Sequence, residues 1–489
     1  MVKKMNKLKN LFDIEIKKYK DKFLKYVKLD KWRNKYHLMP PIGWINDPNG
    51  LCQLNGKYHI FYQYSPLDAK NGLKFWGHYT TRDFINYNDE DIFLYPDQSF
   101  DKSGVYSGSA IIKNKEIYIF YTGNVKEEGE FDYINFGRQH NTIMVKYDGY
   151  KNISLKKVIL KNEDYPSNLS LHVRDPQILR KDDIYYMVLG ARTKENKGVA
   201  LIYKSFDLNK WVFMKEINSE YFGYMWECPN IVFIENKMVM IFSPQGLKKE
   251  KYKFQNIYQS GYIILEDNFL ENDSNKIDVS RFVELDVGFD FYAPQVFIDE
   301  KGRIILIAWL GLPDEEKYIN PTIENYWQHQ LSLPRELYLK NNKIYQKPLE
   351  EFKNLRNNFI EIRDIKLCNE NIEFDIIPNY SFEMSIDINS DEFIFTFRDI
   401  DLIYKNKEFI IKIGKSGYGR DKRYVKIDII DNLNIFSDNS SVEIFINYGE
   451  KVLSTRIYNE DIINKIKLCG KGNFNIKKWN LKNIQINNV

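Results

Sequence analysis

From residue 57 onward the chain repeats one pattern, a polar turn followed by a short, continuously apolar strand. The apolar strands span residues 58–62, 117–121, 184–189, 238–242 and 304–310. Their starts are separated by 59, 67, 54 and 66 residues, and each interval holds several further strand-like stretches. A period of about 60 residues with about four strands per unit is typical of propeller blades. The pattern therefore predicts a five-bladed β-propeller.

Different patterns flank the repeats. Residues 8–27 carry apolar side chains near helical spacing and predict an amphipathic helix. After about residue 340, alternating strands such as 393–397 and 442–447 predict a C-terminal β-sandwich. We therefore expect an all-β protein with a short N-terminal helix. The expected divisions are a helical extension (1–34), the propeller (35–340), a linker (341–357) and the sandwich (358–489).

A short polar element keeps the same phase as the repeat. It lies ahead of each apolar strand and contains a proline in four of the five copies. In three copies it carries an acid, Asp47, Asp175 or Glu227, placed 9 to 11 residues before the strand begins. Equivalent positions on radially arranged blades converge on one end of the central channel. We therefore predict that these three acids, far apart in sequence, lie close together.

Two carboxyl groups and a supporting third suit the hydrolysis of a glycosidic bond. One attacks or activates water and the other protonates the leaving oxygen. A short Asp suits a nucleophile at the channel floor, which favours Asp47, and the longer Glu227 suits a proton donor. Asp175 would then hold sugar hydroxyl groups. Any one of these acids alone is more often a turn or surface residue, and only their conjunction at one phase indicates chemistry.

Aromatic and polar side chains accompany the acids. Rings pack against the C–H faces of sugars, while amides, hydroxyls and guanidinium groups bind sugar hydroxyls. His172 is expected to be structural or to support a neighbour rather than to catalyse. The predicted substrate-binding residues are Trp44, Ile45, Asn46, Gln63, Trp76, Tyr106, Ser107, Arg174, Tyr292 and Trp309.

Composition and charge exclude several other classes. Aromatic residues make up 15% of the 489 residues, which favours β-structure and ring-binding pockets. The net charge of +4 arises from residues 1–38, which hold 13 Lys and Arg against 4 Asp and Glu; the remainder holds 58 against 63. A mildly acidic body gives no support for nucleic-acid binding. The longest apolar run has seven residues, too few to span a membrane.

Metal, nucleotide and redox chemistry are likewise not indicated. The six histidines and four cysteines form no pair with metal or redox spacing, and there is neither a P-loop nor a GxGxxG motif after a strand. We therefore expect no cofactor and no metal, and a small-molecule sugar as the ligand. Scattered thiols and the lack of a secretory signal predict a cytoplasmic protein.

Three segments of the chain resemble glycoside hydrolase family 32, which includes invertases and fructan hydrolases. The residues that carry the resemblance are the stretch 37–50 around Asn46-Asp47-Pro48, then Arg174-Asp175-Pro176 and Glu227-Cys228-Pro229. Further similarity runs from about residue 35 to the C-terminus, including residues 333–336 and 441–445. The resemblance implies a five-bladed propeller with a sandwich domain.

The family's mechanism assigns a role to each acid. Asp47 falls on the nucleophile, Asp175 on the residue that stabilises the transition state, and Glu227 on the acid/base. The resemblance therefore implies a retaining enzyme that releases a terminal β-D-fructofuranosyl unit through a covalent fructosyl intermediate. Retention predicts carboxyl groups of Asp47 and Glu227 about 5–5.5 Å apart.

Within the family, residues 121–126, Tyr133 and Gly137-Arg138 resemble bacterial sucrose-6-phosphate hydrolases. This implies sucrose or sucrose 6-phosphate as substrate, with Lys126 and Arg138 as candidate phosphate ligands. A fructan hydrolase acting on inulin or levan, a fructosyltransferase and a non-catalytic sugar-binding propeller remain alternatives. The sequence leaves the oligomeric state open.

Overall fold

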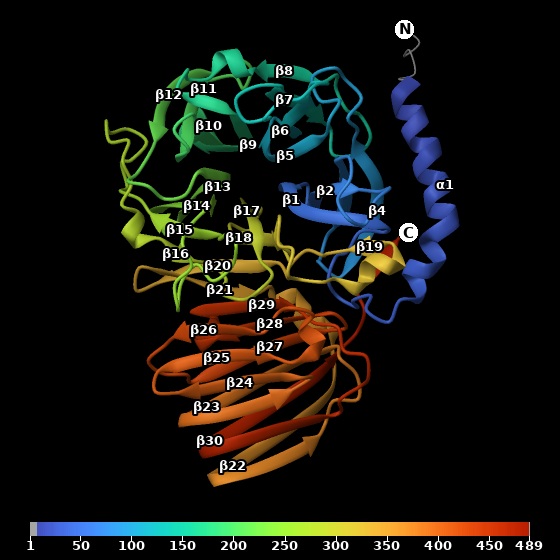
Figure 1. The fold of residues 1–489 in the computed structure, drawn as a ribbon, viewed down its shortest axis with the longest axis vertical. Helices are drawn as coiled ribbons and strands as arrows, with labels where there is room; N and C mark the ends of the chain where they lie inside the picture. Colours follow the sequence, from blue (N-terminus) through green and yellow to red (C-terminus); the bar gives the residue numbers. More distant parts are fainter. Residues whose placement is uncertain (1–6, 489) are drawn as a thin grey trace.

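The computed structural model describes residues 7–488, and its architecture is mostly β (Figure 1). One helix, α1 (Lys7–Leu29), stands beside a ring of sheets, and a C-terminal β-domain lies below the ring. Among the described residues, no helix combines the length and apolar character needed to cross a bilayer.

Each blade of the ring contains four strands in chain order, and in the fifth blade β19 (Trp327–Gln328) intervenes in the chain between the second and third of them. The first blade contains β1 (Gly43–Leu54), β2 (Lys57–Ser65), β3 (Phe75–Thr81) and β4 (Asn86–Leu94). The second contains β5 (Val105–Lys113), β6 (Glu116–Lys126), β7 (Arg138–Tyr147) and β8 (Lys157–Leu160). The third contains β9 (Leu169–Lys181), β10 (Ile184–Thr193), β11 (Gly198–Ser205) and β12 (Val212–Ile217).

Two more blades complete the ring. The fourth contains β13 (Met225–Ile234), β14 (Lys237–Gln245), β15 (Gly261–Ile264) and β16 (Val283–Glu284). The fifth contains β17 (Tyr292–Ile298), β18 (Ile304–Trp309), β20 (Arg335–Lys340) and β21 (Lys343–Pro348). The innermost strands β1, β5, β9, β13 and β17 contact one another in turn, and β17 returns to β1. Across residues 7–488 this confirms the predicted five-bladed propeller.

The apolar repeat of the sequence corresponds to the second strand of each blade. In β6, for example, Ile117 and Ile119 pack toward the first blade, whereas Tyr118 and Phe120 pack toward the third. Because neighbouring blades cover both faces of a sheet, both sets of side chains are apolar. This explains why these strands read as continuous apolar runs instead of alternating ones.

The C-terminal domain is one curled sheet, in which nine strands are described. Its long strands β22 (Arg356–Asp375), β23 (Phe382–Phe397) and β30 (Lys465–Leu481) lie side by side. The remaining strands are β24 (Ile400–Lys405), β25 (Glu408–Ile413), β26 (Lys422–Lys426), β27 (Asn432–Asp438), β28 (Ser441–Ile446) and β29 (Lys451–Arg456). The predicted C-terminal β-sandwich is thus confirmed, and the long strands join its layers into one sheet.

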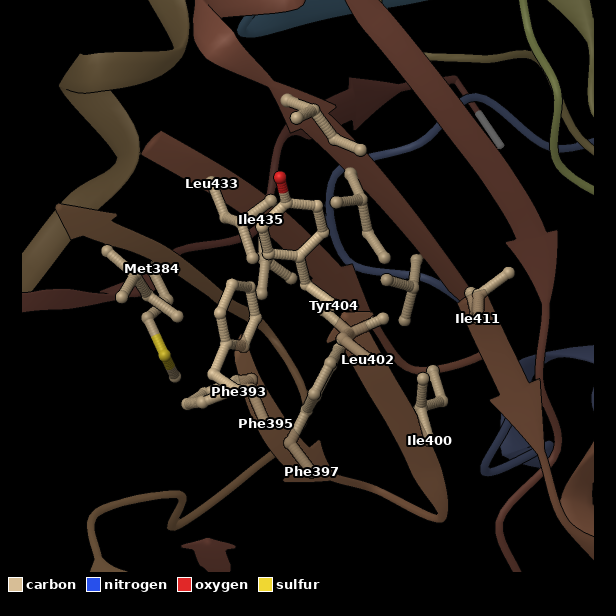
Figure 2. Packing of buried hydrophobic residues seen from close by; sticks show 14 of the residues in the cluster. Met384, Phe393, Phe395, Phe397, Ile400, Leu402, Tyr404, Ile411, Leu433 and Ile435 are labelled. Atoms are coloured by element: carbon tan, nitrogen blue, oxygen red, sulfur yellow. The ribbon is translucent and has the colours of Figure 1, made fainter. Parts of the chain in front are cut away.

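The curl of this sheet encloses its own apolar core. Figure 2 shows Phe393 and Phe395 of β23 beside Leu402 of β24 and Ile435 of β27. All four side chains are almost completely inaccessible to solvent. Val287 and Phe289, from the propeller segment between β16 and β17, belong to the same cluster, so the propeller contributes to this core.

The first blade gains strands and a helix from distant parts of the chain. Strand β19 (Trp327–Gln328) pairs in parallel with β1, and β31 (Gln485–Asn487) pairs in parallel with β4. Helix α1 packs Ile16 against Phe75, with one face turned to the blade. The predicted helix is confirmed, although Leu8 and Leu11, which share the expected apolar periodicity, are exposed.

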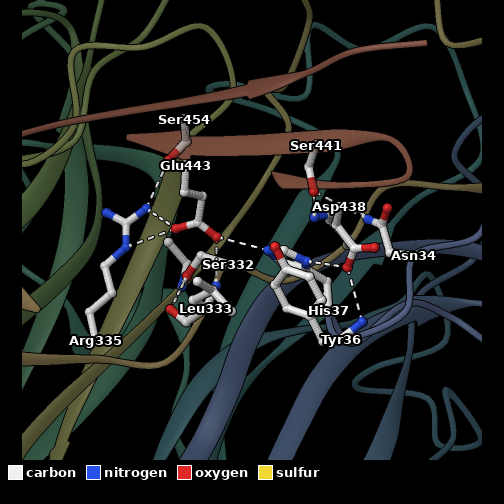
Figure 3. A network of polar contacts seen from close by, with 12 residues as sticks. Asn34, Tyr36, His37, Ser332, Leu333, Arg335, Asp438, Ser441, Glu443 and Ser454 are labelled. Atoms are coloured by element: carbon white, nitrogen blue, oxygen red, sulfur yellow. Dashed lines mark hydrogen bonds and ion pairs between the residues drawn. The ribbon is translucent and has the colours of Figure 1, made fainter. Parts of the chain in front are cut away.

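A buried network of charged groups joins the two domains (Figure 3). His37 Nδ1 lies 2.8 Å from Asp438 Oδ2, and His37 Nε2 lies 3.0 Å from Glu443 Oε1. Glu443 Oε2 also accepts a bond of 2.5 Å from Arg335, which contacts Asp286 at 3.2 Å. Burial opposes a charge on His37, but the bonds to both carboxylates outweigh it and raise the pKa of the imidazole.

Replacing Arg335 by Met should lower the free energy of unfolding by about 3–5 kcal/mol, because Glu443 and Asp286 would stay buried without their cation. Denaturant titration followed by circular dichroism measures this change. Arg363→Met is the matched control, since the Arg363 side chain is 70% exposed beside Glu361 and its loss should leave the free energy of unfolding nearly unchanged. Equally small effects of both substitutions would contradict the assigned role of the network.

Candidate active site

Every innermost strand carries a β-bulge at the same level of the channel. The pairing with the second strand skips between Ile45 and Pro48 in β1, and at equivalent places in β5, β9, β13 and β17. Three bulge residues, Asp175, Cys228 and Ala293, have positive φ angles of 62°, 47° and 49°. A bulge bends the strand and redirects its side chains. The short polar elements of the sequence are therefore interruptions within strands.

A cavity of about 880 Å³ opens at these bulges, and it brings together the three predicted acids. Most of the predicted substrate-binding residues also line it. Those that do so are Trp44, Asn46, Gln63, Tyr106, Ser107, Arg174, Tyr292 and Trp309. Side chains from all five blades thus surround one space, as the phase of the repeat predicts.

Asp47 is held by neutral donors. Its Oδ1 accepts a hydrogen bond of 3.0 Å from Asn46, and its Oδ2 accepts a short bond from Ser107. Gln63 ties these donors together, because its Oε1 accepts from Asn46 at 3.0 Å and its Nε2 donates to Ser107 at 2.6 Å. Burial raises the pKa of Asp47, while the bonds from Ser107 and Asn46 oppose the increase.

Asp175 and Cys228 lie against Asp47. The backbone N–H of Cys228 donates to Asp175 Oδ2 at 3.0 Å. The Sγ atom of Cys228 lies 3.6 Å from the same oxygen and 3.8 Å from Asp47 Oδ2. Burial raises the pKa of Asp175 to about 7; Arg174 opposes this, and the charges of Glu227 and Asp47 add to it. This carboxyl group therefore responds strongly to charge that appears in the cavity.

Glu227 accepts hydrogen bonds on both oxygens. Oε1 accepts from Arg174 at 2.5 and 3.0 Å, and Oε2 accepts from Tyr292 at 2.6 Å and from Gln245 at 2.7 Å. Four donor contacts fix the orientation of the carboxyl group toward the cavity. Gln245 was not predicted from the sequence, although it ends the apolar strand β14, opposite the element that contains Glu227.

His172 supports Arg174. Its Nδ1 accepts from Arg174 at 2.6 Å, and its Nε2 donates to the backbone oxygen of Tyr133 at 2.9 Å. Burial, followed by the charge of Arg174, lowers the pKa of His172, so the imidazole is neutral. It lines the cavity wall, and as a neutral imidazole it cannot serve as a general acid at neutral pH.

Two predicted substrate-binding residues do not line the cavity. Ile45 is fully buried in the apolar core between the fifth and first blades, because it alternates with Trp44 and Asn46 along β1. Trp76 is buried between the first and second blades, and its Nε1 donates to the backbone oxygen of Tyr106 at 3.1 Å. Both residues are close in sequence to cavity residues, but the sequence did not show that their side chains point into apolar cores.

Several cavity residues carry no motif and were missed by the sequence interpretation. They include the buried Lys74, which precedes β3, and Arg192 at the end of β10. Tyr224, Tyr258 and Asp314 also line the cavity and form a hydrogen-bonded row, with bonds of 2.9 and 3.2 Å. Among residues 7–488 no cluster of His, Cys, Asp or Glu could hold a metal ion.

Two family models match the chain. Residues 37–348 match the N-terminal domain of glycosyl hydrolases family 32, and residues 381–488 match the C-terminal domain of that family. The chain belongs to glycosyl hydrolase family 32. It is therefore a glycosidase with the family's propeller fold, and the family works by a retaining mechanism.

Related members of family 32 cover nearly the whole chain. A sucrose-6-phosphate hydrolase of Bacillus subtilis (strain 168) is 36% identical over 92% of this chain and 95% of its own length. The structure of a sucrose-6-phosphate hydrolase from Lactobacillus gasseri has a TM-score of 0.81 at 29% identity and covers 94% of this chain and 96% of its own. A mutant family 32 beta-fructofuranosidase of Bombyx mori in complex with sucrose has a TM-score of 0.79 at 27% identity over 96% and 98%.

Trp76→Phe tests the corrected position of Trp76. Loss of the bond to Tyr106 and of ring volume should lower the free energy of unfolding by about 1–3 kcal/mol. The KM for sucrose should remain within about twofold of the wild-type value, because the Trp76 ring does not line the cavity. Thermal unfolding and steady-state kinetics at a temperature well below Tm measure both effects. A large rise in KM with unchanged stability would return Trp76 to the substrate site.

Proposed function

We propose that this family 32 enzyme hydrolyses sucrose 6-phosphate, releasing its β-D-fructofuranosyl unit with retention of configuration. The observation that carries the proposal is the convergence of Asp47, Asp175 and Glu227 in one cavity, each with a different set of donors. Two carboxyl groups of distinct environment are what a double displacement at an anomeric carbon needs.

In the first step Asp47 attacks the anomeric carbon of the fructosyl unit. The carbon–oxygen bond to the glucosyl unit breaks, and Glu227 gives its proton to the departing oxygen. In the second step water attacks the same carbon, Glu227 takes the proton of the water, and the ester bond to Asp47 breaks. Asp175 binds fructosyl hydroxyl groups in this scheme and stabilises the positive charge that develops on the sugar ring.

The Ser107 and Asn46 bonds prepare Asp47 for attack. They stabilise its charged form in a buried place, where desolvation alone would favour the neutral acid. Arg174 holds Glu227 in position and also lies 4.0 Å from Asp175. The guanidinium group thus orients two of the three acids at once.

Asp47→Asn should lower kcat on sucrose by about 10⁴-fold or more, because the amide cannot form the covalent intermediate. Circular dichroism should show an unchanged fold. Asp314→Asn, which changes another acid that lines the same cavity, is the matched control and should retain turnover by Asp47 and Glu227. Full turnover by Asp47→Asn would disprove its role as nucleophile.

A pair of cations favours a phosphorylated sugar as the substrate. Lys126 and Arg138 are direct partners across β6 and β7, and both line the cavity. Like charges at such a position repel each other. Burial lowers the pKa of Lys126, and the charge of Arg138 lowers it further. Burial also lowers the pKa of Arg138, Tyr106 opposes this, and the charge of Arg174 adds to it. Within the described residues neither forms an ion pair with an acid. An anion between them would relieve this repulsion.

Arg138 also has an unused donor. Its Nη1 donates to His140 Nε2 at 3.2 Å, whereas its Nε is buried without a partner in the described chain. Sucrose-6-phosphate hydrolases are prominent among the similar proteins. A cytoplasmic location forms part of the same proposal, and the four free cysteines of the chain are consistent with it.

Lys126→Met and Arg138→Met should each reduce kcat/KM for sucrose 6-phosphate by about 10- to 100-fold, since each removes a charged contact to the phosphate. For unphosphorylated sucrose the change should stay below about threefold. Arg192→Met is the control, because this cavity cation is occupied by bonds of 3.0 and 2.6 Å to Asn196. Equal losses on both sugars, or wild-type preference for sucrose or inulin, would contradict the phosphate assignment.

A further inference from the structure

Lys74 brings a buried cation to the cavity that the scheme above does not use. Lys74 is 9% exposed, and it lines the cavity together with Trp44 and Asp47. Within residues 7–488 the ammonium group has no ion pair, and Ser65 Oγ, at 3.0 Å, is its hydrogen-bond acceptor. Burying an ammonium group without a close carboxylate is unfavourable. The position therefore calls for a functional explanation.

Several contacts fix the ammonium group. Ser65 Oγ donates in turn to the backbone oxygen of Gly72 at 3.1 Å, and the backbone oxygen of Lys74 accepts from Val105 at 2.9 Å. The nitrogen lies 4.9 Å from the centre of the Trp44 ring, whose face attracts a cation. The Trp44 indole donates to Asn46 at 2.9 Å, and Asn46 donates to Asp47. Lys74 thus rests on the same assembly that holds Asp47.

The two buried cations of the cavity floor are divided between the acids. Arg174 is bound to Glu227 and lies beside Asp175. Asp47 instead has neutral donors and the more distant charge of Lys74. Burial raises the pKa of Asp47, the bonds from Ser107 and Asn46 lower it, the charge of Glu227 raises it further, and Lys74 lowers it.

The effect is reciprocal. Burial lowers the pKa of Lys74 to about 7, and the charges of Asp47 and Asp68 oppose this decrease. The titratable groups that face Lys74 are Asp47 from β1, Asp68 from the segment after β2, and His329 after β19. His329 stays neutral because burial lowers its pKa, and nearby cations, Lys74 among them, lower it further. Below about pH 7 Lys74 is therefore charged, and its charge opposes the rise that burial causes in the pKa of Asp47.

On the basis of the proposed role of Asp47 as nucleophile, we infer that Lys74 is a positioning residue. Its ammonium group stabilises the carboxylate form of Asp47 and so extends hydrolysis to lower pH. Lys74 does not need to touch the reacting atoms to act in this way, because Coulombic interactions in a buried site reach beyond hydrogen-bond distance.

The test is the pH profile of kcat/KM for unphosphorylated sucrose, a substrate that keeps phosphate binding out of the comparison. In Lys74→Met the acidic limb should move to higher pH by about one unit, which makes kcat/KM about tenfold lower below the limb. Above about pH 8, where Lys74 of the wild type is itself neutral, the two profiles should converge. Arg192→Met removes a cavity cation bound to Asn196 and should keep the wild-type acidic limb.

Other outcomes would overturn the inference. An unmoved acidic limb in Lys74→Met, or an equal loss at every pH, would assign Lys74 to packing or to sugar binding. If Lys74→Met does not fold, Lys74→Gln takes its place in the test. Lys74→Arg keeps the positive charge and should preserve the wild-type acidic limb. If wild-type enzyme releases no fructose, the proposed function fails. NMR titration of the Asp47 carboxyl group in wild type and Lys74→Met then tests the inference by itself.

Discussion

The packing of five twisted sheets around one axis is the constraint on which the rest of this structure depends. Apolar side chains fill the space between neighbouring blades, so both faces of each sheet are buried and the polar groups that can do chemistry gather around the central cavity. Every inner strand has a β-bulge, and these bulges direct side chains such as Asp47 and Asp175 toward one common cavity. The active site is thus a consequence of how the ring closes.

The ring has one seam, between the fifth and first blades, and the C-terminal domain covers it. His37, which precedes β1, and Arg335 of β20 both bind Glu443 of that domain. The apolar core at the seam likewise contains Phe436 and Phe445 from the C-terminal sheet beside Ile45 of β1. Because β19 also pairs with β1, three kinds of contact close the ring where chain connectivity does not. The second domain therefore stabilises the geometry that the acids need.

The sequence predicted the fold and the meeting of the acids because both follow from a period. The second strands are buried on both sides, so they appear as apolar runs, and the acids share a fixed offset from them. The directions of individual side chains were not predictable in the same way. Ile45 and Trp76 neighbour active residues yet face apolar cores, and a bulge changes which residues of a strand face the channel. Lys74 lies in no motif, and its importance follows only from burial beside Asp47.

The charge balance of the cavity connects these features to catalysis. The carboxyl groups of Asp47, Asp175 and Glu227 face the cations Arg174 and Lys74, and the imidazoles of His172 and His329 stay neutral and add no further positive charge. With Glu227 protonated, as the proposed first step requires, the negative charges of Asp47 and Asp175 balance the positive charges of Lys74 and Arg174. A fructosyl ring that becomes positive as its bond breaks is stabilised by the two carboxylates, whereas the uncharged fructosyl unit of the bound substrate gains little from them. Asp175, whose pKa burial raises to about 7, is the group whose ionisation such a positive charge would most favour. The same burial that makes the acids costly in the resting enzyme therefore makes them effective in the transition state.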